Sequence, residues 1–316
     1  MSSSQSKKKV VIIGAGMVGS TVAYTILMNH LAAEIVLIDI DKERAKGEAL
    51  DMNHGIAFLK QIDVRSGDYR DCEDADIIII TAGLGRKPGQ TRLDLAKVNV
   101  AIAKDITKNI MEHNRDPLIL VISNPVDILT YVVQKESGLS PKRVFGSGTT
   151  LDTGRFRFLL SEHCKVDVRN VHGYIIGEHG DSQVPVWSKA NIAGKSFDEY
   201  CGDCPRKCKK VNRADIAEKT RTAGAEIINN KGATYYGIAL AASRIVSSII
   251  GNEHSVLTVS SVVSGEYGVE DIALSLPCVI NSSGIERIMT IQLNDDEIRQ
   301  LHESEKILKD ILTQVY

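Results

Sequence analysis

Short runs of apolar, largely β-branched residues alternate with longer segments of helical period through the first half of the chain. Four of these runs are expected to be strands: Val10–Ile13, Ile35–Ile38, Ile77–Thr81 and Leu118–Ser123. Their residues are apolar throughout, which is typical of strands that helices cover on both faces of a parallel sheet. The pattern therefore predicts an α/β fold of the Rossmann type, a doubly wound parallel sheet.

The rhythm changes after about Gly148, and the second half is expected to form an α+β domain. Its pattern predicts helices at 151–164, at 214–229 and from about 295, a strand at 171–176, and β-rich segments at 256–264 and 271–276. Neither a low-complexity linker nor an internal repeat interrupts the sequence. We therefore expect two domains, residues 1–148 and 149–316, that pack tightly around a shared cleft.

Composition narrows the class of partner. The 316 residues suffice for two domains, and 38 Lys and Arg against 40 Asp and Glu give a net charge of −2. A nucleic-acid-binding protein needs a basic surface, so the expected partner is a small molecule. No run approaches the roughly 20 apolar residues that span a bilayer, and no secretory leader is evident, so a cytoplasmic protein without a membrane partner is expected.

The six cysteines are expected to be reduced thiols. Three of them, Cys201, Cys204 and Cys208, lie close together and raise the alternative of a metal site. Three thiolates in a polar connection favour a surface loop over a metal site. We therefore expect no metal.

A glycine-rich turn, Gly-Ala-Gly-Met-Val-Gly at 14–19, follows the first expected strand and leads into a helical segment. Gly14 permits the tight turn, Gly16 lets a pyrophosphate approach the backbone N–H groups, and Gly19 allows close packing of helix and strand. Asp39 stands 20 residues after Gly19, at the end of the second expected strand. A carboxylate there accepts hydrogen bonds from the adenosine ribose and repels a 2′-phosphate, which favours NAD over NADP.

Three further segments place polar groups just past expected strand ends, where an open α/β sheet builds its site. They are Thr-Ala-Gly-Leu-Gly-Arg-Lys-Pro-Gly-Gln-Thr-Arg at 81–92, Ser-Asn-Pro-Val-Asp at 123–127 and Gly-Glu-His-Gly-Asp at 177–181. The first has the composition of a mobile lid with charged tips, Arg86 and Arg92.

These motifs, with Leu-Asp-Thr-Gly-Arg-Phe-Arg at 151–157 and Lys-Gly-Ala-Thr-Tyr-Tyr-Gly at 231–237, resemble those of the lactate/malate dehydrogenase family. The resemblance runs from about Lys9 to the C-terminal helix. It implies reversible hydride transfer between NAD and an L-2-hydroxy acid, in a homo-oligomer for which a tetramer is favoured and a dimer stays open. It also implies the following cofactor-binding residues: Gly14, Gly16, Met17, Val18, Gly19, Asp39, Gly83, Leu84, Ile122 and Asn124.

The resemblance implies a role for each polar residue of the cleft. His179 would be the acid/base, because imidazole titrates near neutral pH, and Asp152 would hold its other N–H and raise its pKa. Arg155 would bind the substrate's C1 carboxylate as a bidentate pair, and Arg92 would polarise the carbonyl when the lid closes. Asn124 would bond both substrate and cofactor.

Two residues give opposite indications about the substrate. The resemblance implies that the position six residues before Arg92 faces the substrate's C3 substituent, and Arg86 there resembles malate-type members. The charge argument agrees, because an arginine facing the methyl group of pyruvate would be an unpaired buried charge, whereas oxaloacetate supplies a carboxylate partner. Thr234 resembles lactate-type members, and the steric effect of one such group is smaller. We therefore expect malate and oxaloacetate as substrates, with lactate and pyruvate as the alternative.

Three other hypotheses stay open at this point. Tyr131 and Lys135 fit the Tyr-x-x-x-Lys pair of short-chain dehydrogenases. Arg157 and His172 match positions that contribute to a sugar-bisphosphate site in bacterial lactate-type members, and would form an allosteric anion site. A non-catalytic NAD-binding protein on the same fold is the remote alternative.

Overall fold

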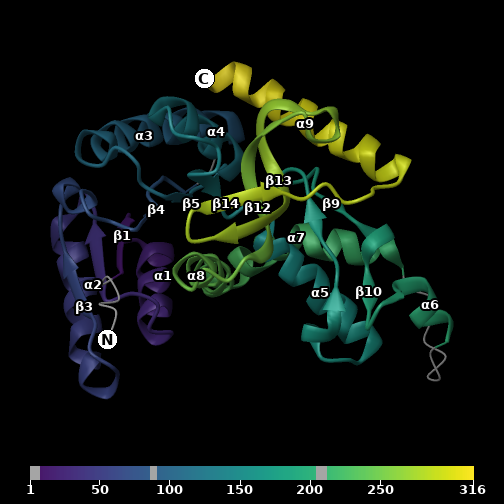
Figure 1. Ribbon diagram of the computed structural model, residues 1–316, viewed down its shortest axis with the longest axis horizontal. Coiled ribbons are helices and arrows are strands. Elements are labelled where there is room, and N and C mark those ends of the chain that lie inside the picture. The colour runs from purple at the N-terminus through teal and green to yellow at the C-terminus, as the bar shows by residue number, and fades with distance from the viewer. Residues whose placement is uncertain (1–7, 86–90, 204–211) are drawn as a thin grey trace, which may run out of the picture.

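The computed structural model describes residues 8–85, 91–203 and 212–316. Within them, a sheet of nine strands forms the centre, in the order β14-β13-β12-β6-β5-β4-β1-β2-β3 (Figure 1). Six of these strands are parallel, as expected for a doubly wound fold: β1 (Lys9–Ile13), β2 (Glu34–Ile38), β3 (Asp63–Ser66), β4 (Ile77–Ile80), β5 (Ile119–Val121) and β6 (Val144–Gly146).

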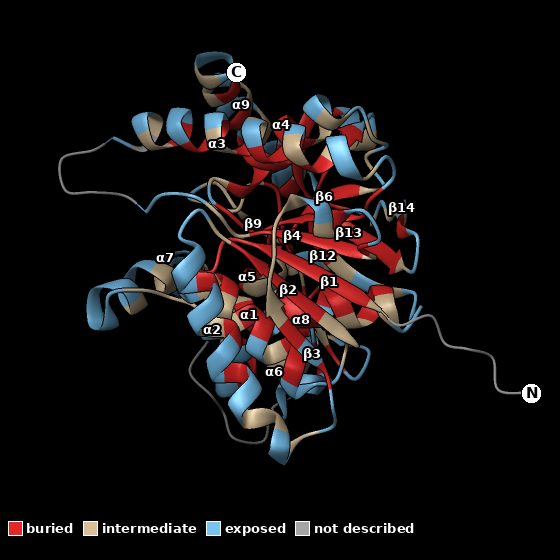
Figure 2. Cartoon of the chain, turned by 90° about the vertical axis from the view of Figure 1, so that its left-hand side faces the viewer, coloured by how far each residue is buried: buried red, intermediate tan, exposed pale blue. Residues whose placement is uncertain are grey.

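Helices cover both faces of the parallel strands, and the strands lie buried between them (Figure 2). One face packs against α1, α2 and α8, and the other against α3, α4 and the C-terminal α9. This two-sided burial is why the strand sequences are apolar at every position. The helices of both halves are α1 (Met17–Met28), α2 (Lys42–Gly55), α3 (Arg92–His113), α4 (Val126–Ser137), α5 (Thr150–Cys164), α6 (Phe197–Gly202), α7 (Arg213–Lys231), α8 (Tyr236–Ile250) and α9 (Asp295–Val315).

The second half contributes an antiparallel extension to the same sheet. β12 lies antiparallel to β6, with Ser260 opposite Gly146, and pairs along its length with β13. The fold class is thus confirmed as a Rossmann sheet followed by an α+β part. The remaining strands are β7 (Val171–His172), β8 (Ile175–Ile176), β9 (Val184–Pro185), β10 (Asn191–Ile192), β11 (Lys195–Ser196), β12 (Ser255–Ser264), β13 (Glu270–Asn281) and β14 (Gly284–Ile288).

Short 3₁₀ helices complete the described elements. They are η1 (Ile56–Phe58), η2 (Tyr69–Cys72), η3 (Val168–Asn170), η4 (Trp187–Lys189) and η5 (Glu266–Gly268). Among the described helices of both kinds, none combines the length and apolar character that a bilayer crossing requires.

The expected strand at 171–176 is wrong. The segment forms two short strands, β7 and β8, that belong to different sheets and are divided at Gly173. A Cβ atom on Gly173 would lie 2.9 Å from the Phe156 ring, so the backbone passes too close to α5 for a continuous strand of larger residues. The sequence pattern does not indicate β3, β6 or α8. The strands β3 and β6 form through pairing with their neighbours in the sheet, and α8 is stabilised by its packing against α1.

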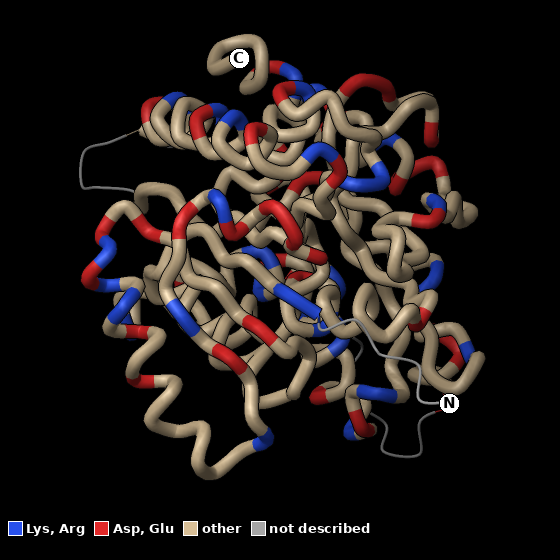
Figure 3. Tube along the Cα trace, turned by 60° about the vertical axis from the view of Figure 1, so that its left-hand side comes forward, with Lys and Arg blue, Asp and Glu red and all other residues tan. Residues whose placement is uncertain are grey.

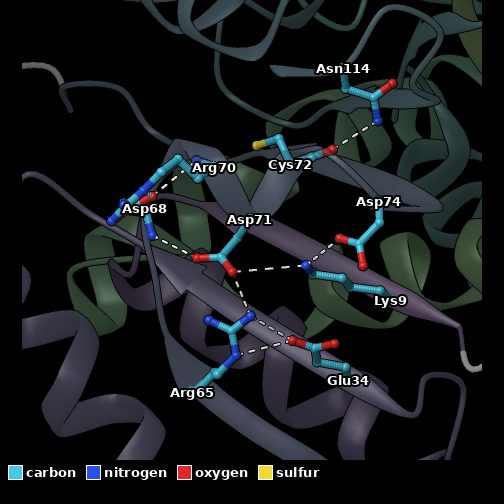
Figure 4. A network of polar contacts seen from close by, with 9 residues as sticks. All are labelled: Lys9, Glu34, Arg65, Asp68, Arg70, Asp71, Cys72, Asp74 and Asn114. Atoms are coloured by element: carbon cyan, nitrogen blue, oxygen red, sulfur yellow. Dashed lines mark hydrogen bonds and ion pairs between the residues drawn. The ribbon is translucent and has the colours of Figure 1, made fainter. Parts of the chain in front are cut away.

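Lys and Arg positions are interspersed with Asp and Glu positions along the described chain (Figure 3). One dense network lies at the edge of the parallel sheet, where Asp71 of η2 accepts a hydrogen bond from Arg65 of β3 and faces Lys9 of β1 (Figure 4). Arg65 also bonds Glu34 of β2, and the Lys9 Nζ lies 2.5 Å from Asp74 Oδ1. The Lys9 side chain is 7% exposed, so its charge depends on these carboxylates for compensation.

We predict that Asp71→Asn lowers the free energy of unfolding by about 2 kcal/mol, because it leaves Arg65 and Lys9 without a shared carboxylate. Burial opposes ionisation of Asp71, but the hydrogen bond from Arg65 outweighs burial and lowers the pKa of Asp71. The stabilisation is therefore present above the unfolded pKa of about 4 and is lost as the pH falls through the lower pKa of the folded state. Urea unfolding at several pH values measures both effects.

The matched control is Asp203→Asn, since Asp203 pairs with Lys195 where both side chains are exposed. This change should alter stability far less than Asp71→Asn. Equal losses in the two variants would contradict the assigned role of the Asp71 network.

Candidate active site

A cleft of about 490 Å³ opens at the carboxyl ends of β1, β4 and β5 and continues between the two halves of the chain. This is the edge where an open α/β sheet places its site. The expected residues Val18, Gly83, Leu84, Ile122, Asn124, Asp152, Arg155, His179 and Thr234 all line it. The structure therefore brings together residues from both halves that are up to 216 positions apart, from 18 to 234.

The β1–α1 turn has the geometry that a dinucleotide requires. Gly14 has φ +107°, and a Cβ atom on Gly19 would lie 1.8 Å from the Gly14 carbonyl oxygen. A Cβ atom on Gly16 would meet open space, and Gly16 begins α1 without a side-chain cap. The first N–H groups of this 12-residue helix are thus left for an anion, as a bound pyrophosphate needs, while Met17 beside them is 61% exposed.

Asp39 lies at the end of β2, beside this turn. Its Oδ2 accepts the Ala15 N–H at 2.6 Å, and its Oδ1 accepts the Asp41 N–H at 2.9 Å. The carboxylate is therefore held against the glycine-rich backbone, where a negative charge disfavours a 2′-phosphate. Together with Gly16, this arrangement fits NAD.

The chemical end of the cleft centres on His179, which follows β8. Its Nδ1 lies 2.6 Å from Asp152 Oδ2, and Arg155 Nη1 donates to the other oxygen of Asp152 at 2.9 Å. Asp152 is 3% exposed at its side chain, whereas His179 retains 27% exposure toward the cleft. Because Nδ1 is engaged by the carboxylate, Nε2 is the nitrogen left to exchange a proton with a substrate.

The charges around His179 set its protonation. Burial disfavours a charged imidazole, but the Asp152 carboxylate outweighs it and raises the pKa of His179 to about 9. Burial likewise opposes ionisation of Asp152, yet His179 and Arg155 keep its pKa below the ordinary value. At neutral pH the pair is an imidazolium and a carboxylate.

The segment that carries His179 is held by several elements. Gly177 exchanges two backbone hydrogen bonds of 2.9 Å with Ser275 of β13, and the Glu178 N–H donates to Ser304 of α9 at 2.7 Å. The His179 N–H donates to Asp127 of α4, also at 2.7 Å. These contacts fix the segment that carries His179 from three directions before any ligand binds.

The start of α5, which carries Asp152 and Arg155, is anchored by threonine hydroxyls. Thr149 Oγ1 donates to the Ile175 carbonyl, Thr150 Oγ1 donates to the Thr258 carbonyl, and Thr153 Oγ1 accepts the Ile175 N–H. These bonds hold α5 to β8 and β12. They therefore fix the distance between Asp152 and the His179 segment, which follows β8.

Asn99, on the buried side of α3, is a residue that the sequence analysis missed. Its Oδ1 accepts the Leu84 N–H at 2.8 Å, and its Nδ2 donates to the Asn124 carbonyl at 2.7 Å. It thus ties the segment before the expected lid to the turn that carries Asn124. A lone asparagine on the apolar face of an amphipathic helix was the signal available for it.

Two further charged residues line the cleft without having been assigned. Arg221 of α7 lies 3.9 Å from Asp181 and forms an ion pair with Glu218 on its own helix. Gly224, one turn farther along α7, lies against Arg155: a Cβ atom there would be 3.7 Å from its guanidinium.

Several predicted residues lie elsewhere or outside the described part. Arg86, Cys204 and Cys208 fall outside the described residues, and for Arg92 only its place at the first position of α3 is given. The metal alternative for these cysteines consequently stays undecided by the geometry. The described residues contain no group of three or more His, Cys, Asp or Glu placed to hold a metal ion.

Arg157 and His172 lie close to each other but away from the cleft lining. Arg157 Nε donates to the carbonyl of Val171 at 2.6 Å, directly before the exposed His172 in β7. Burial lowers the pKa of Arg157. Their binding of an anion stays a prediction.

The Tyr131–Lys135 pair does not line the cleft. Tyr131 Oη and Lys135 Nζ both donate to Asp271 of β13, at 3.1 and 2.7 Å, and the Tyr131 ring packs edge-on against Tyr316. This contact joins α4 to β13 and the C-terminus. The short-chain dehydrogenase hypothesis is wrong because this tyrosine's hydroxyl faces a carboxylate, remote from the cofactor turn.

A dinucleotide-binding sheet whose cleft also holds a buried carboxylate–imidazole pair and a guanidinium is typical of nicotinamide-dependent dehydrogenases that act on hydroxy acids. Comparison with known proteins agrees with this class. Residues 8–146 match the family described as lactate/malate dehydrogenase, NAD binding domain, and 149–316 match its alpha/beta C-terminal domain. The chain belongs to the lactate/malate dehydrogenase family and is an NAD-dependent oxidoreductase of the CH-OH group of an L-2-hydroxy acid.

Among the relatives, L-lactate dehydrogenase of Acetivibrio thermocellus is 52% identical over 305 residues, which cover 96% of each chain. L-lactate dehydrogenase 1 of Clostridium acetobutylicum is 47% identical and covers 98% of each chain. A solved lactate dehydrogenase from a Medee basin deep-sea metagenome library superposes with a TM-score of 0.95 at 44% identity, covering 98% of this chain and 99% of its own.

These relatives correct the expected substrate. The prediction of malate and oxaloacetate is wrong, because relatives about half identical over nearly the full length are L-lactate dehydrogenases. That prediction weighted the charge of Arg86 above the rest of the cleft. The prediction assumed that the Arg86 guanidinium is desolvated against the substrate, but Arg86 lies outside the described residues. The lactate-like Thr234, in contrast, lines the cleft.

We predict that Asp152→Asn lowers the pKa of His179 from about 9 toward its ordinary value of 6.5, because the neutral amide no longer stabilises the imidazolium. NMR titration of ¹³C-labelled histidine measures the change. Asp167→Asn, which removes an exposed carboxylate paired with Arg169, is the control for loss of one negative charge. An unchanged His179 titration in Asp152→Asn would refute the assignment.

Proposed function

We propose that this enzyme interconverts pyruvate and L-lactate with NADH and NAD. The observation that carries the proposal is the approximately half-identical, full-length likeness to L-lactate dehydrogenases. The cleft supports it with a His179–Asp152 pair, a guanidinium at Arg155 and a threonine at position 234.

Arg155 is the residue proposed to bind the carboxylate of the 2-oxo acid. Its Nη1 is bonded to Asp152, and the packing of Gly224 against the guanidinium leaves no bulky side chain between α7 and this group. A planar guanidinium binds a carboxylate through two parallel hydrogen bonds, which fixes the orientation of the substrate carbonyl as well as its position.

When bound, the nicotinamide ring of NADH supplies the hydride that reduces the substrate carbonyl carbon. His179 donates its Nε2 proton to the carbonyl oxygen, which becomes the hydroxyl group of lactate. Asp152 keeps the imidazole protonated and oriented before transfer. In the reverse reaction neutral His179 accepts the hydroxyl proton, and Asp152 stabilises the imidazolium that forms.

Asn124 and Arg92 complete the proposed site. Asn124 lies in the cleft just past the end of β5, and its carbonyl is held by Asn99. It is proposed to bond both substrate and cofactor. Arg92 is proposed to polarise the carbonyl oxygen. Cytoplasmic location, homotetramer formation and an anion site at Arg157 and His172 stay predictions.

The direct test compares kcat/KM for NADH oxidation with pyruvate and with oxaloacetate. We expect pyruvate to be preferred by at least about tenfold, and NADH to be preferred over NADPH because of Asp39. A clear preference for oxaloacetate would overturn the proposal.

We predict that His179→Asn lowers kcat for pyruvate reduction by about 10³-fold, since asparagine provides no titrating proton donor. Tyr131→Phe is the matched control, because its hydroxyl serves a contact with Asp271 outside the cleft. Steady-state kinetics of both variants measure the difference. Loss of activity in Tyr131→Phe with retention in His179→Asn would contradict the roles assigned.

A further inference from the structure

A second carboxylate, besides Asp152, contacts the acid/base residue. Asp127 lies in the first turn of α4 and is 2% exposed. Its Oδ2 accepts the backbone N–H of His179 at 2.7 Å. This carboxylate therefore approaches His179 from the cofactor half of the chain, whereas Asp152 approaches the imidazole from α5.

The other oxygen of Asp127 belongs to a buried polar cluster. Within the described residues, Asp127 Oδ1, Thr130 Oγ1 and Ser260 Oγ are all buried without a hydrogen-bond partner. Gly146 lies among these groups: a Cβ atom on it would be 2.4 Å from Thr130 Oγ1 and 3.2 Å from the Ser260 Cβ. Buried polar groups of this kind are rare, because leaving one unpaired destabilises the folded state.

The position of Asp127 links two parts of the site. It lies three residues after Asn124, whose carbonyl accepts a hydrogen bond from Asn99. Its carboxylate binds the segment that contains His179. One side chain thus joins the expected substrate-binding turn to the backbone of the acid/base residue. Its replacement by a hydrophobic residue would remove a contact between the two halves of the cleft.

Several charged groups share the cleft with His179, and Arg221 of α7 and Asp181, which lie 3.9 Å apart, are among them. Asp152 and Arg155 project from α5, Asp127 projects from α4, and Glu178 precedes His179 in its own segment. Contacts from β13 and α9 to this segment are made by uncharged groups, Ser275 and Ser304. Asp127 is consequently the charge that the cofactor half adds to this cluster.

We propose that Asp127 is a positioning residue for the proposed dehydrogenase reaction: it fixes the backbone of His179 and places a second negative charge beside the imidazolium. The inference rests on the proposed acid/base role of His179 for its kinetic consequence. The fixed backbone of His179 and the effect of the second charge on the imidazole are properties of the folded protein and do not require substrate.

The ionisation of Asp127 is consistent with this role. Burial raises its pKa to about 6, while the nearby Ser260 hydroxyl and the hydrogen bond from the His179 N–H act in the opposite direction. Asp127 is thus predominantly ionised at neutral pH. Its charge also contributes to the raised pKa of His179, after the larger effects of burial and Asp152.

The test is Asp127→Asn, which removes the charge but keeps the shape and an amide oxygen that can accept the His179 N–H. NMR titration of the histidine should show the His179 pKa lowered by about one pH unit. The alkaline limb of kcat/KM for pyruvate reduction should move to lower pH by the same amount, because protonated His179 is the reactive form. KM for pyruvate at neutral pH should change by less than about twofold.

Thr130→Val is the matched control, since it removes a neighbouring buried hydroxyl and leaves both carboxylates in place. It should leave the His179 titration unchanged. A folded Asp127→Asn protein with the wild-type His179 titration would overturn the proposal, even if its melting temperature is lower, since a structural role alone changes stability without changing the titration.

A measurement on the unaltered protein keeps the proposal testable if Asp127→Asn does not fold. The His179 resonance should respond near pH 6, where Asp127 titrates, in addition to its own titration near pH 9. Absence of the response near pH 6 would overturn the proposal. Since this readout needs no turnover, it decides the role of Asp127 even if the enzyme proves inactive toward pyruvate and the proposed function fails.

Discussion

The close approach of Gly148 to β12 and β13, and of Gly146 to α4 and β12, is the constraint on which the site depends. A Cβ atom on Gly148 would lie 2.5 Å from the Ser260 nitrogen and 2.4 Å from Ser275 Oγ, and one on Gly146 would lie 2.4 Å from Thr130 Oγ1. Only glycine fits at these positions, so the parallel sheet can pass directly into the antiparallel strands. The same approach sets where α5 begins, and hence where Asp152 lies.

From that junction, polar contacts converge on the segment around His179. Ser275 of β13 pairs with both backbone groups of Gly177, and Ser304 of α9, Asp127 of α4 and Asp152 of α5 each bond one further group of the segment. A site held in this way needs little reorganisation when charge develops on the substrate oxygen, which is the basis of electrostatic catalysis. The buried carboxylates are retained because a cation, the imidazolium, compensates them.

Much of the site could be read from local sequence because its motifs are short and lie at strand ends. Gly14, Gly16, Asp39, His179 and Asp152 are in this group, since each belongs to a turn or helix start with a recognisable composition. The bonds made by Asn99 and Asp127 could not be anticipated, because their partners lie 15 to 52 residues away in the sequence. The substrate prediction failed for a related reason: one charged residue was weighed without knowledge of its surroundings.

The sequence by itself determined the parallel sheet and the dinucleotide turn and indicated His179 and Asp152 as candidate residues, because apolar runs, glycines and titrating side chains act over a few residues. Only the tertiary structure decided that β12 and β13 extend that sheet, that 171–176 divides into two strands, and which buried groups hold His179. These features depend on pairing and packing between distant segments, whose energy is absent from any local pattern.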